Sequence, residues 1–408
     1  MKLRVRQPHK LSGDALRQLP YSRRMYDISD LELPHDERDA LLTELRATPG
    51  LVRDEINGVW LVARHTDVCA ASQDPTTFSN ASGVTYFDAV PLSFVTMDPP
   101  EHGRLRRIVS RQFTPRMVKE LREDTRRWTD SALDTVRGED EFDFVSAVAA
   151  PVTLRVIAEM VGMPVEDLDR IKVWTDQMMD ASGRLEEPGM LEQAMGAYAD
   201  WSAYVDDQVD QRLGSPGDDL LSRLAHADDE RLDREELALF ATALMVAGNE
   251  TTRHTSSRGV EVLSDHPEQR ARFGRDPHCR RVAVEEILRW ATPVRAFMRT
   301  VAADTVLSGT ELRVGDRLVL LYPSANRDEA VFDDPFTFDI SRDPNPHLAF
   351  GIGTHYCIGA NLARMEIDVI LGAVYERHPD LSLVPGTRPV HRASGLVAGV
   401  AAMPVRTR

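Results

Sequence analysis

Residues 350–359 read Phe350-Gly351-Ile352-Gly353-Thr354-His355-Tyr356-Cys357-Ile358-Gly359, and this segment decides the fold. Gly351 and Gly353 permit a tight, bulged loop before the cysteine, and Gly359 lets another group approach closely. Cys357 then falls at the first turn of a helix, where free backbone N–H groups and the helix dipole favour a thiolate. A lone cysteine is more often a small buried hydrophobic residue, so its neighbours must decide between the two interpretations.

The spacing of these residues, Phe-Gly-x-Gly-x-His-x-Cys-x-Gly, resembles the haem-binding signature of the cytochrome P450 family at every key position. The resemblance extends over nearly the whole chain. It implies a mainly α fold, with a large helical body, a long central helix and small peripheral β-sheets, built as a single domain over residues 1–408. It also implies that Cys357 holds the iron of haem b, with Phe350, His355 and Gly359 beside the cofactor. A thiolate on haem iron donates electron density and promotes O–O cleavage.

Local sequence patterns also predict a largely helical chain. The clearest helix begins at Asp233, with Glu236 as its capping-box partner, and runs to about Leu263 before His266-Pro267 ends it. About thirty residues would span about 45 Å, long enough to cross a whole domain. Further helices are expected over 284–290 and 358–377, with irregular coil over 335–350.

Strand signals are short and few. Asn57-Gly58 lies between two apolar runs. It predicts a hairpin, because this pair accepts the positive φ angles of a tight turn. A strand is expected over 318–322 and a second hairpin edge over 396–400.

The central helix carries the segment Ala247-Gly248-Asn249-Glu250-Thr251-Thr252, which resembles the oxygen-activation motif of the family. A glycine in mid-helix and a threonine that bonds back to a preceding carbonyl favour a kink that opens a groove. The resemblance implies that Ala247 and Gly248 contact the cofactor. It further implies that Thr251 supplies an alcohol and Glu250 an acid, which deliver protons to dioxygen. The alternative is an ordinary polar patch on a long helix.

Glu286 and Arg289 form a Glu-x-x-Arg pair on one face of the predicted helix 284–290. In isolation such a pair is usually a solvated ion pair. The resemblance implies that Arg342 joins them in a buried network that holds the cysteine loop in place. We expect these three residues to be structural and not catalytic.

The two propionates of haem need cationic partners. His102 and Arg106 lie four residues apart, so they share a helix face. Together with Arg299 and His355 they match the propionate-binding positions of the family, in matching order along the chain. Singly, each arginine would more often be an ordinary surface residue.

Electrons for this chemistry are expected from separate proteins, a ferredoxin and its ferredoxin reductase. The length of 408 residues leaves no room for a fused reductase, and the chain has no Gly-x-Gly-x-x-Gly fingerprint. Arg104, Arg107 and Arg111 form a candidate docking patch for an acidic ferredoxin. A solvated helix face is the equal alternative.

The most specific resemblance is to actinobacterial hydroxylases of sterol side chains and methyl-branched lipids. It rests on residues 247–254, 289–294, 345–347 and 357–364. It implies a hydrophobic substrate oxidised at an unactivated C–H bond. The side chains expected to line the pocket are Phe87, Phe94, Leu244, Val294, Arg295, Phe297 and Val397. Arg295 is a departure that suits a polar group of the substrate, although we expect it to point to solvent.

Composition limits which partners and which cellular compartment we expect for the protein. Lysine and arginine total 49 against 65 acidic residues, a net charge of −16 that argues against binding to nucleic acid or to an anionic membrane. No run of about 18 apolar residues predicts a membrane span. Three cysteines without paired spacing suit a reducing compartment. We therefore expect a cytoplasmic monomer.

Alternative functions remain within the resemblance. Tailoring of a secondary metabolite, such as a polyketide, competes with lipid or sterol hydroxylation. A peroxygenase would use hydrogen peroxide, although Glu250 and Thr251 disfavour it. A haem-based sensor or carrier would bind haem without turnover.

Overall fold

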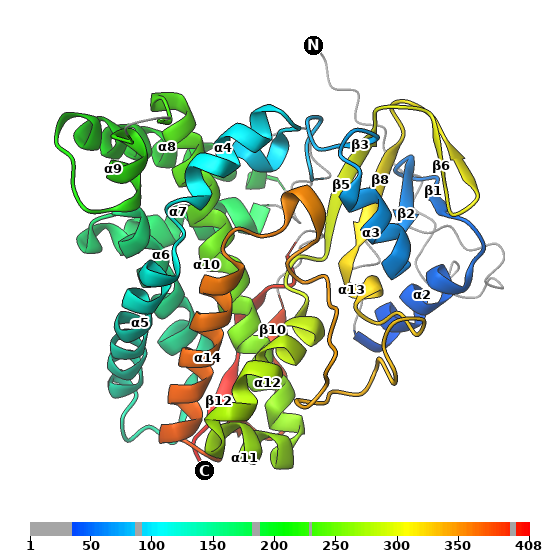
Figure 1. The fold of residues 1–408 in the computed structure, drawn as a ribbon. Helices are drawn as coiled ribbons and strands as arrows, with labels where there is room; N and C mark the ends of the chain where they lie inside the picture. The colour runs from blue at the N-terminus through cyan, green and yellow to red at the C-terminus, as the bar shows by residue number, and fades with distance from the viewer. Residues whose placement is uncertain (1–34, 86–91, 182–187, 228–230, 392–396) are drawn as a thin grey trace.

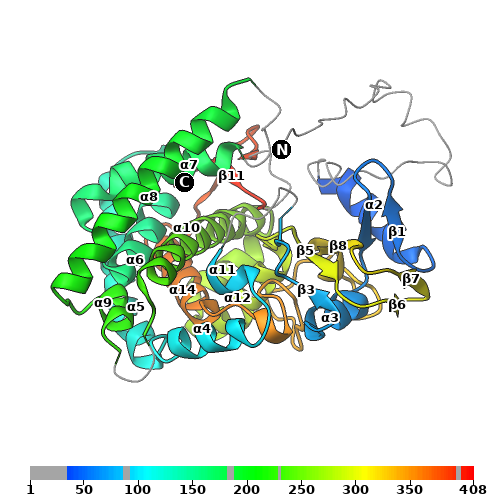
Figure 2. The same ribbon diagram turned by 90° about the horizontal axis from the view of Figure 1, so that it is seen from above.

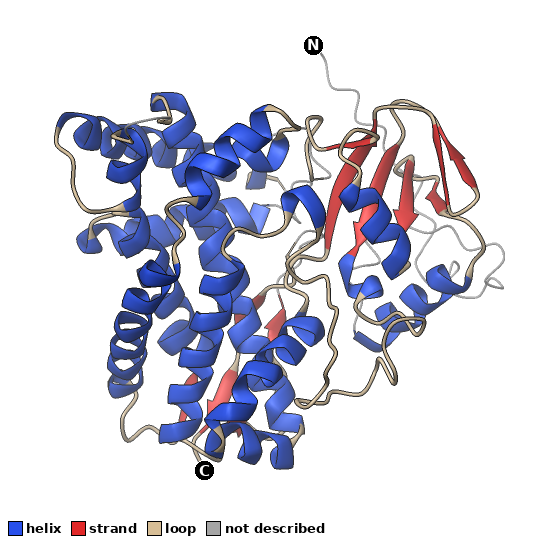
Figure 3. Cartoon of the chain, viewed as in Figure 1, coloured by secondary structure: helices blue, strands red, loops and turns tan. Residues whose placement is uncertain are grey.

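The computed structural model describes residues 35–85, 92–181, 188–227, 231–391 and 397–408. Helices make up most of these residues, and the strands gather mainly at the N-terminal side, next to α2 and α3 (Figures 1 and 3). The mainly α prediction is therefore confirmed. No helix in the described part of the chain is long and apolar enough to cross a membrane.

The larger, helical part of the molecule contains most of the helices. They are α4 (Glu101–Ser110), α5 (Pro115–Thr135), α6 (Ala150–Val161), α7 (Leu168–Ala181), α8 (Met190–Gly214), α9 (Leu220–Ala225), α10 (Arg234–Asp265), α11 (Pro267–Arg275), α12 (Pro277–Ala291) and α14 (Ala360–Arg377). Beside the main sheet lie α2 (His35–Ala47), α3 (His65–Gln73) and the short α13 (Tyr322–Ala325). Single turns occur at Ser93–Thr96, Val145–Ala149, Val165–Asp167 and Gly353–His355.

The main sheet has five strands in the order β1-β2-β8-β5-β3. Its strands are β1 (Val52–Asp54), β2 (Val59–Val62), β3 (Phe78–Ser79), β5 (Ala296–Val301) and β8 (Arg317–Leu321). Strands β2 and β8 are parallel, and the other neighbours are antiparallel. The predicted hairpin is confirmed, because β1 pairs with β2 and Gly58 has a φ of 70°.

Three smaller sheets complete the described strands. They are β6 (Thr305–Leu307) with β7 (Thr310–Leu312), β10 (Val390–His391) with β11 (Val400–Ala402), and β4 (Glu141–Asp143) with β12 (Pro404–Arg406) and β9 (Ser382–Leu383). Of the hairpin edge predicted over 396–400, Leu396 lies outside the described residues, Val397 forms a single bridge with Val294, and β11 begins at Val400.

Helix α10 crosses the helical part of the molecule, as predicted (Figure 2). It begins with the expected capping box, in which Asp233 accepts from the N–H of Glu236 and Glu236 accepts from the N–H of Asp233. Buried apolar side chains on several sides of the helix show that it lies in the core. The 32 residues form one uninterrupted α-helix, which continues through Gly248 and Thr251. A Cβ at Gly248 would lie 2.6 Å from Ile157 of α6, so this glycine serves the close packing of two helices.

Candidate active site

The cysteine loop is a tight, bulged segment held against α3. Gly351 and Gly353 have φ angles of 67° and 76°, which side chains rarely adopt. A Cβ at Gly353 would lie 2.5 Å from the carbonyl oxygen of Ser72, so only glycine fits there. The Cys357 N–H donates to the Phe350 carbonyl at 2.9 Å and closes the loop.

Cys357 lies just before α14 and not in its first turn as predicted, because the helix begins at Ala360. Its side chain is accessible although protein surrounds it, so the thiol faces an interior space. A Cβ at Gly359 would meet no atom within 4 Å. Burial raises the pKa of the Cys357 thiol, while the Gly359 N–H and the charge of Arg106 act in the opposite direction.

The four basic side chains that the sequence assigned to the propionates lie close together, near this cysteine. His102 and His355 have ring centroids 4.3 Å apart, and Arg106 of α4 donates to the Tyr356 carbonyl at 2.5 Å. Arg299 of β5 is 3% exposed and lies near enough to His355 to affect its charge. Both ring nitrogens of His102 and the Nε2 atom of His355 are buried without a hydrogen-bond partner.

The electrostatics of this basic cluster indicate a missing anion. Burial lowers the pKa of His102, Arg106 and Arg299. Burial and the positive charges of its neighbours lower the pKa of His355 to about 3. Asp98 is a nearby carboxylate, but it already accepts hydrogen bonds from Ser79 and from the Asn80 N–H. A buried group of cations is stable only beside compensating negative charge.

Helix α10 presents one accessible face in its middle. Ala247 is exposed and Thr251, one turn later, is half-buried. The Thr251 hydroxyl donates to the Ala247 carbonyl at 2.7 Å, which is the predicted back-bond. Gly248 lies beside them in sequence but faces Ile157, so the predicted open face consists of Ala247 and Thr251 without Gly248.

Glu250 does not share this accessible face. Successive residues of a helix are about 100° apart around its axis, and Glu250 is 1% exposed. Its Oε2 accepts from Arg253 at 2.5 Å and from His254 at 2.9 Å. Arg253 also contacts Asp176 of α7 at 3.3 Å. The predicted acid is therefore held in a buried ion-pair network.

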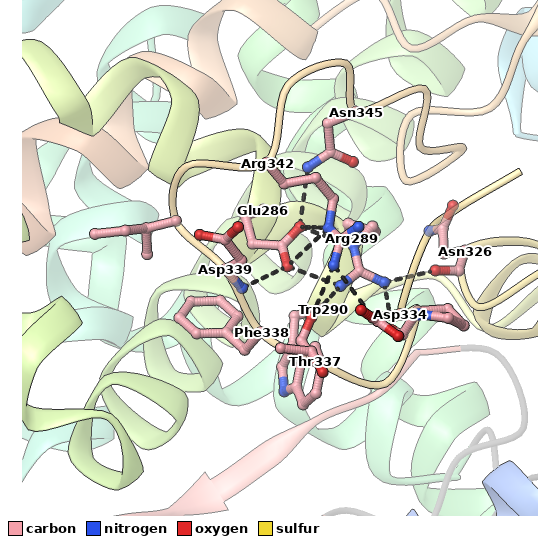
Figure 4. A network of polar contacts seen from close by, with 12 residues as sticks. Glu286, Arg289, Trp290, Asn326, Asp334, Thr337, Phe338, Asp339, Arg342 and Asn345 are labelled. Atoms are coloured by element: carbon pink, nitrogen blue, oxygen red, sulfur yellow. Dashed lines mark hydrogen bonds and ion pairs between the residues drawn. The ribbon is translucent and has the colours of Figure 1, made fainter. Parts of the chain in front are cut away.

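The predicted contacts among Glu286, Arg289 and Arg342 are present, with Glu286 and Arg289 fully buried and Arg342 partly exposed (Figure 4). Arg289 donates to both carboxylate oxygens of Glu286, at 2.8 and 2.7 Å, and neither side chain is exposed. Arg342 contacts Glu286 at 3.2 Å, and Asn345 donates to it at 3.0 Å. Arg289 also donates to the main-chain carbonyls of Asn326, Pro335 and Thr337. This network ties α12 to the irregular segment that precedes the cysteine loop.

A second network, which the sequence analysis missed, contacts the cysteine loop directly. Arg364 of α14 donates to both oxygens of Glu285, at 2.7 and 2.9 Å, and to the Tyr356 hydroxyl at 3.2 Å. The guanidinium of Arg364 lies 4.5 Å from the Phe350 ring centroid. Burial alone would raise the pKa of Glu285, but hydrogen bonds from His347 and Arg364 lower it to about 2. The only sequence signal for this second network was Glu285, the glutamate next to Glu286.

The predicted pocket residues come from several elements. The Phe94 ring lies 5.8 Å from His102 and 6.2 Å from Phe240 of α10, whereas Phe87 lies outside the described residues. Leu244 is buried on α10, and Phe297 packs edge-on against Tyr322. Val294 and Val397 form a β-bridge that joins two of the predicted lining segments.

Arg295 is 5% exposed, so our expectation that it points to solvent is wrong. It lies close enough to His391 of β10 to lower the pKa of that histidine. The residue is therefore part of the packed interior and not of the surface.

Comparison with known proteins decides the family. A family model for cytochrome P450 matches residues 281–400. A methyl-branched lipid omega-hydroxylase of Mycobacterium bovis is 40% identical over 371 residues, which cover 88% of this chain and 85% of that protein. This chain belongs to the cytochrome P450 family.

Further relatives agree in sequence and in structure. A steroid C26-monooxygenase of Mycolicibacterium smegmatis is 38% identical over 357 residues, or 84% of this chain and 82% of that protein. A solved structure of a Mycobacterium marinum cytochrome P450 in complex with pseudoionone is 34% identical, with a TM-score of 0.85. It covers 94% of this chain and 100% of that chain. This cytochrome P450 is accordingly a monooxygenase, and its family implies a haem cofactor.

The residues of this cytochrome P450 fit a haem. Cys357 presents a thiol to an interior space, and the absence of a side chain at Gly359 leaves room beside it. The unpartnered nitrogens of His102 and His355, with the basic Arg106 and Arg299 beside them, suit two propionates, which accept hydrogen bonds and carry negative charge. A metal ligand and an anion-binding cluster thus lie where one flat, dianionic cofactor needs both.

Proposed function

We propose that this cytochrome P450 inserts one oxygen atom from dioxygen into a hydrophobic lipid or sterol-type substrate. The balanced reaction is RH + O₂ + 2e⁻ + 2H⁺ → ROH + H₂O. The observation that carries the proposal is the pairing of an accessible Cys357 thiol with a basic cluster in which the buried nitrogens of His102 and His355 have no hydrogen-bond partner. We further propose that residues 1–408 form one domain.

Haem b is the proposed form of the cofactor, with Cys357 as its iron ligand and a haem-thiolate centre as the source of the oxidising power. His102, Arg106, Arg299 and His355 bind the propionates and thereby regain the charge that burial disfavours. Phe350 and Gly359 line the cofactor on the side of the cysteine. Ala247 allows close approach from α10, whereas the packing of Gly248 on Ile157 supports a helix-packing role for that residue.

Proton delivery is assigned to the middle of α10. Thr251 stands on the accessible face with its hydroxyl held by the Ala247 carbonyl, so its oxygen lone pairs can accept from water. Glu250, the residue before Thr251, is buried and is the innermost member of a chain of ion pairs. This chain runs from Glu250 through Arg253 and Asp176 to Lys172, which is 45% exposed on α7. Water supplies the protons at the surface, and Thr251 positions them at the site.

The substrate class follows from the side chains around the site. Phe94, Leu244, Val294, Phe297 and Val397 present apolar surface, which favours a hydrophobic molecule. The activities of relatives, a methyl-branched lipid omega-hydroxylase and a steroid C26-monooxygenase, support the same class. Tailoring of a secondary metabolite is the competing outcome.

Oxygen labelling tests this function. Holoprotein, a ferredoxin and its NADPH-dependent reductase are incubated with iso-palmitic acid or cholest-4-en-3-one under oxygen-18 gas. We expect a hydroxylated product that carries one labelled atom, with the second atom in water, because the reaction splits one O₂ between substrate and water. A product labelled from solvent water, or haem binding without product from either class or from a polyketide panel, would refute monooxygenation.

A separate ferredoxin is the proposed electron donor, and it docks on the outer face of α4. Arg107 and Arg111 are exposed there and suit an acidic partner. We exclude Arg104 from the docking patch that the sequence predicted, because it forms an ion pair with Glu236 of α10. Reversing both charges with Arg107→Glu and Arg111→Glu should slow reduction by ferredoxin at least about tenfold at low salt.

The control for this docking prediction is chemical reduction by dithionite, which should be unchanged in the double variant. Arg116→Glu on α5 is the matched charge reversal, since Arg116 is 87% exposed but lies on another helix. Equal ferredoxin-driven rates in the double variant and in Arg116→Glu would contradict docking at α4.

We propose a cytoplasmic monomer. The described chain has three free cysteines, at 69, 279 and 357, as a reducing compartment favours.

A further inference from the structure

His254 connects the acid of α10 to the C-terminal strand β11. The imidazole is 1% exposed and lies one helical turn after Glu250. Its Nε2 is 2.9 Å from the Glu250 Oε2 atom, and its Nδ1 is 3.0 Å from the Val400 main-chain nitrogen. Both ring nitrogens of this buried histidine therefore have a specific partner.

These two contacts define how the ring is protonated. The Val400 N–H can only donate, so Nδ1 must accept and carries no hydrogen. The other nitrogen, Nε2, then carries the ring hydrogen and donates it to Glu250. A main-chain amide of β11 thus sets the tautomer that the carboxylate needs.

The anchor of His254 belongs to a segment of the proposed substrate pocket. Val397, three residues before Val400, pairs with Val294. The Ala398 N–H donates to the Pro293 carbonyl at 2.7 Å. The Val400 amide therefore links this segment directly to the His254 imidazole.

Glu250 has a second support on its other side. Arg253 donates to the same Oε2 atom at 2.5 Å and contacts Asp176 of α7. Arg253 neutralises the charge of the carboxylate, whereas His254 supplies a directional hydrogen bond and is itself anchored on β11. Both donors belong to α10, but each is held by a different element, Arg253 by Asp176 of α7 and His254 by Val400 of β11.

We infer that His254 is a positioning residue that couples the pocket-lining segment 397–400 to the proton-delivering carboxylate of Glu250. It transfers no proton and contacts neither substrate nor cofactor. This role rests on the proposed function of Glu250. It predicts that loss of the His254 hydrogen bonds impairs the use of electrons for product and leaves substrate affinity intact.

The activity test uses holoprotein with ferredoxin, reductase and iso-palmitic acid. His254→Leu removes both of these hydrogen bonds, and we expect product formed per NADPH consumed to fall at least about tenfold, as the loss of a hydrogen bond to a charged group implies. The dissociation constant for the substrate should change less than about twofold, because no ligand contact is lost. His254→Gln offers an acceptor and a donor again and should restore at least about half of the coupling.

Ser264→Ala is the matched control. The Ser264 hydroxyl accepts from the Leu383 N–H of β9 at 3.2 Å, so this change also cuts a link between α10 and a C-terminal strand, but away from Glu250. Wild-type coupling in His254→Leu, or an equal loss in Ser264→Ala, would overturn the inference. If the wild type itself forms no product, the proposed function fails and the tautomer measurement alone decides the role of His254.

That measurement is nitrogen-15 NMR of histidine-labelled ferrous carbon-monoxide protein, assigned with His254→Gln. We expect His254 to show a protonated Nε2 and an unprotonated Nδ1 at neutral pH. Addition of substrate should shift the Nδ1 resonance. A protonated Nδ1, or a resonance that substrate leaves unchanged, would refute the coupling whatever the activity.

Discussion

Replacing Glu286 by glutamine should destabilise the protein by about 3–5 kcal/mol, because it leaves the buried Arg289 guanidinium without a compensating charge. Glu286 and Arg289 are both 0% exposed, so water cannot replace the lost carboxylate. Glutamine keeps the volume of the side chain, so the change in the free energy of unfolding reports the loss of the negative charge. Urea unfolding of purified protein measures the free energy, and haem content per chain measures the state of the cysteine loop.

The control for Glu286→Gln is Glu311→Gln, which breaks a comparable ion pair with Arg313. Glu311 is 73% exposed, and exposed pairs contribute little to stability. We expect Glu311→Gln to unfold like the wild type. Full haem content and unchanged unfolding of Glu286→Gln would show that the network in Figure 4 does not hold the cysteine loop.

Replacing Thr251 by alanine should lower product formed per NADPH consumed by about tenfold or more, the lower range of positioned proton transfer. The change removes the hydroxyl that accepts from water and donates to the Ala247 carbonyl. Electrons and dioxygen should still be consumed and appear as hydrogen peroxide. Parallel assays of product, NADPH and peroxide measure this uncoupling.

Thr252→Ala is the matched control, because Thr252 is the adjacent hydroxyl but is 3% exposed and away from the accessible face. It should retain wild-type coupling. The outcome also separates the alternative functions. A peroxygenase would retain peroxide-driven turnover in Thr251→Ala, and a sensor would bind ligand equally in both variants without turnover. Equal coupling in Thr251→Ala and Thr252→Ala would remove Thr251 from the mechanism.

Local signals in the sequence predicted most of the elements that build the site. The capping box of Asp233 and Glu236 and the Asn57-Gly58 turn depend on residues a few positions apart. Short-range rules therefore suffice for them. The cysteine loop was equally predictable from the sequence, since the positive φ angles at Gly351 and Gly353 are requirements of the local backbone.

Long-range pairing explains what the sequence did not reveal. Glu285 and Arg364 are 79 residues apart, and no local pattern joins them. The burial of Arg295 and the contact of Gly248 with Ile157 depend equally on which elements pack together. The sequence singled out Glu250 as an acid, but it gave no sign that Arg253 and His254 bind this carboxylate and are themselves tied to Asp176 of α7 and Val400 of β11.

The most direct test of a thiolate-ligated haem is the ferrous carbon-monoxide difference spectrum of the purified holoprotein, recorded beside Cys357→Ala. We predict a strongly red-shifted Soret band in the wild type, because a thiolate donates electron density to the iron, and its loss in the variant. An imidazole-like band in the wild type, or a red-shifted band that survives in Cys357→Ala, would contradict the assignment of Cys357 as the iron ligand.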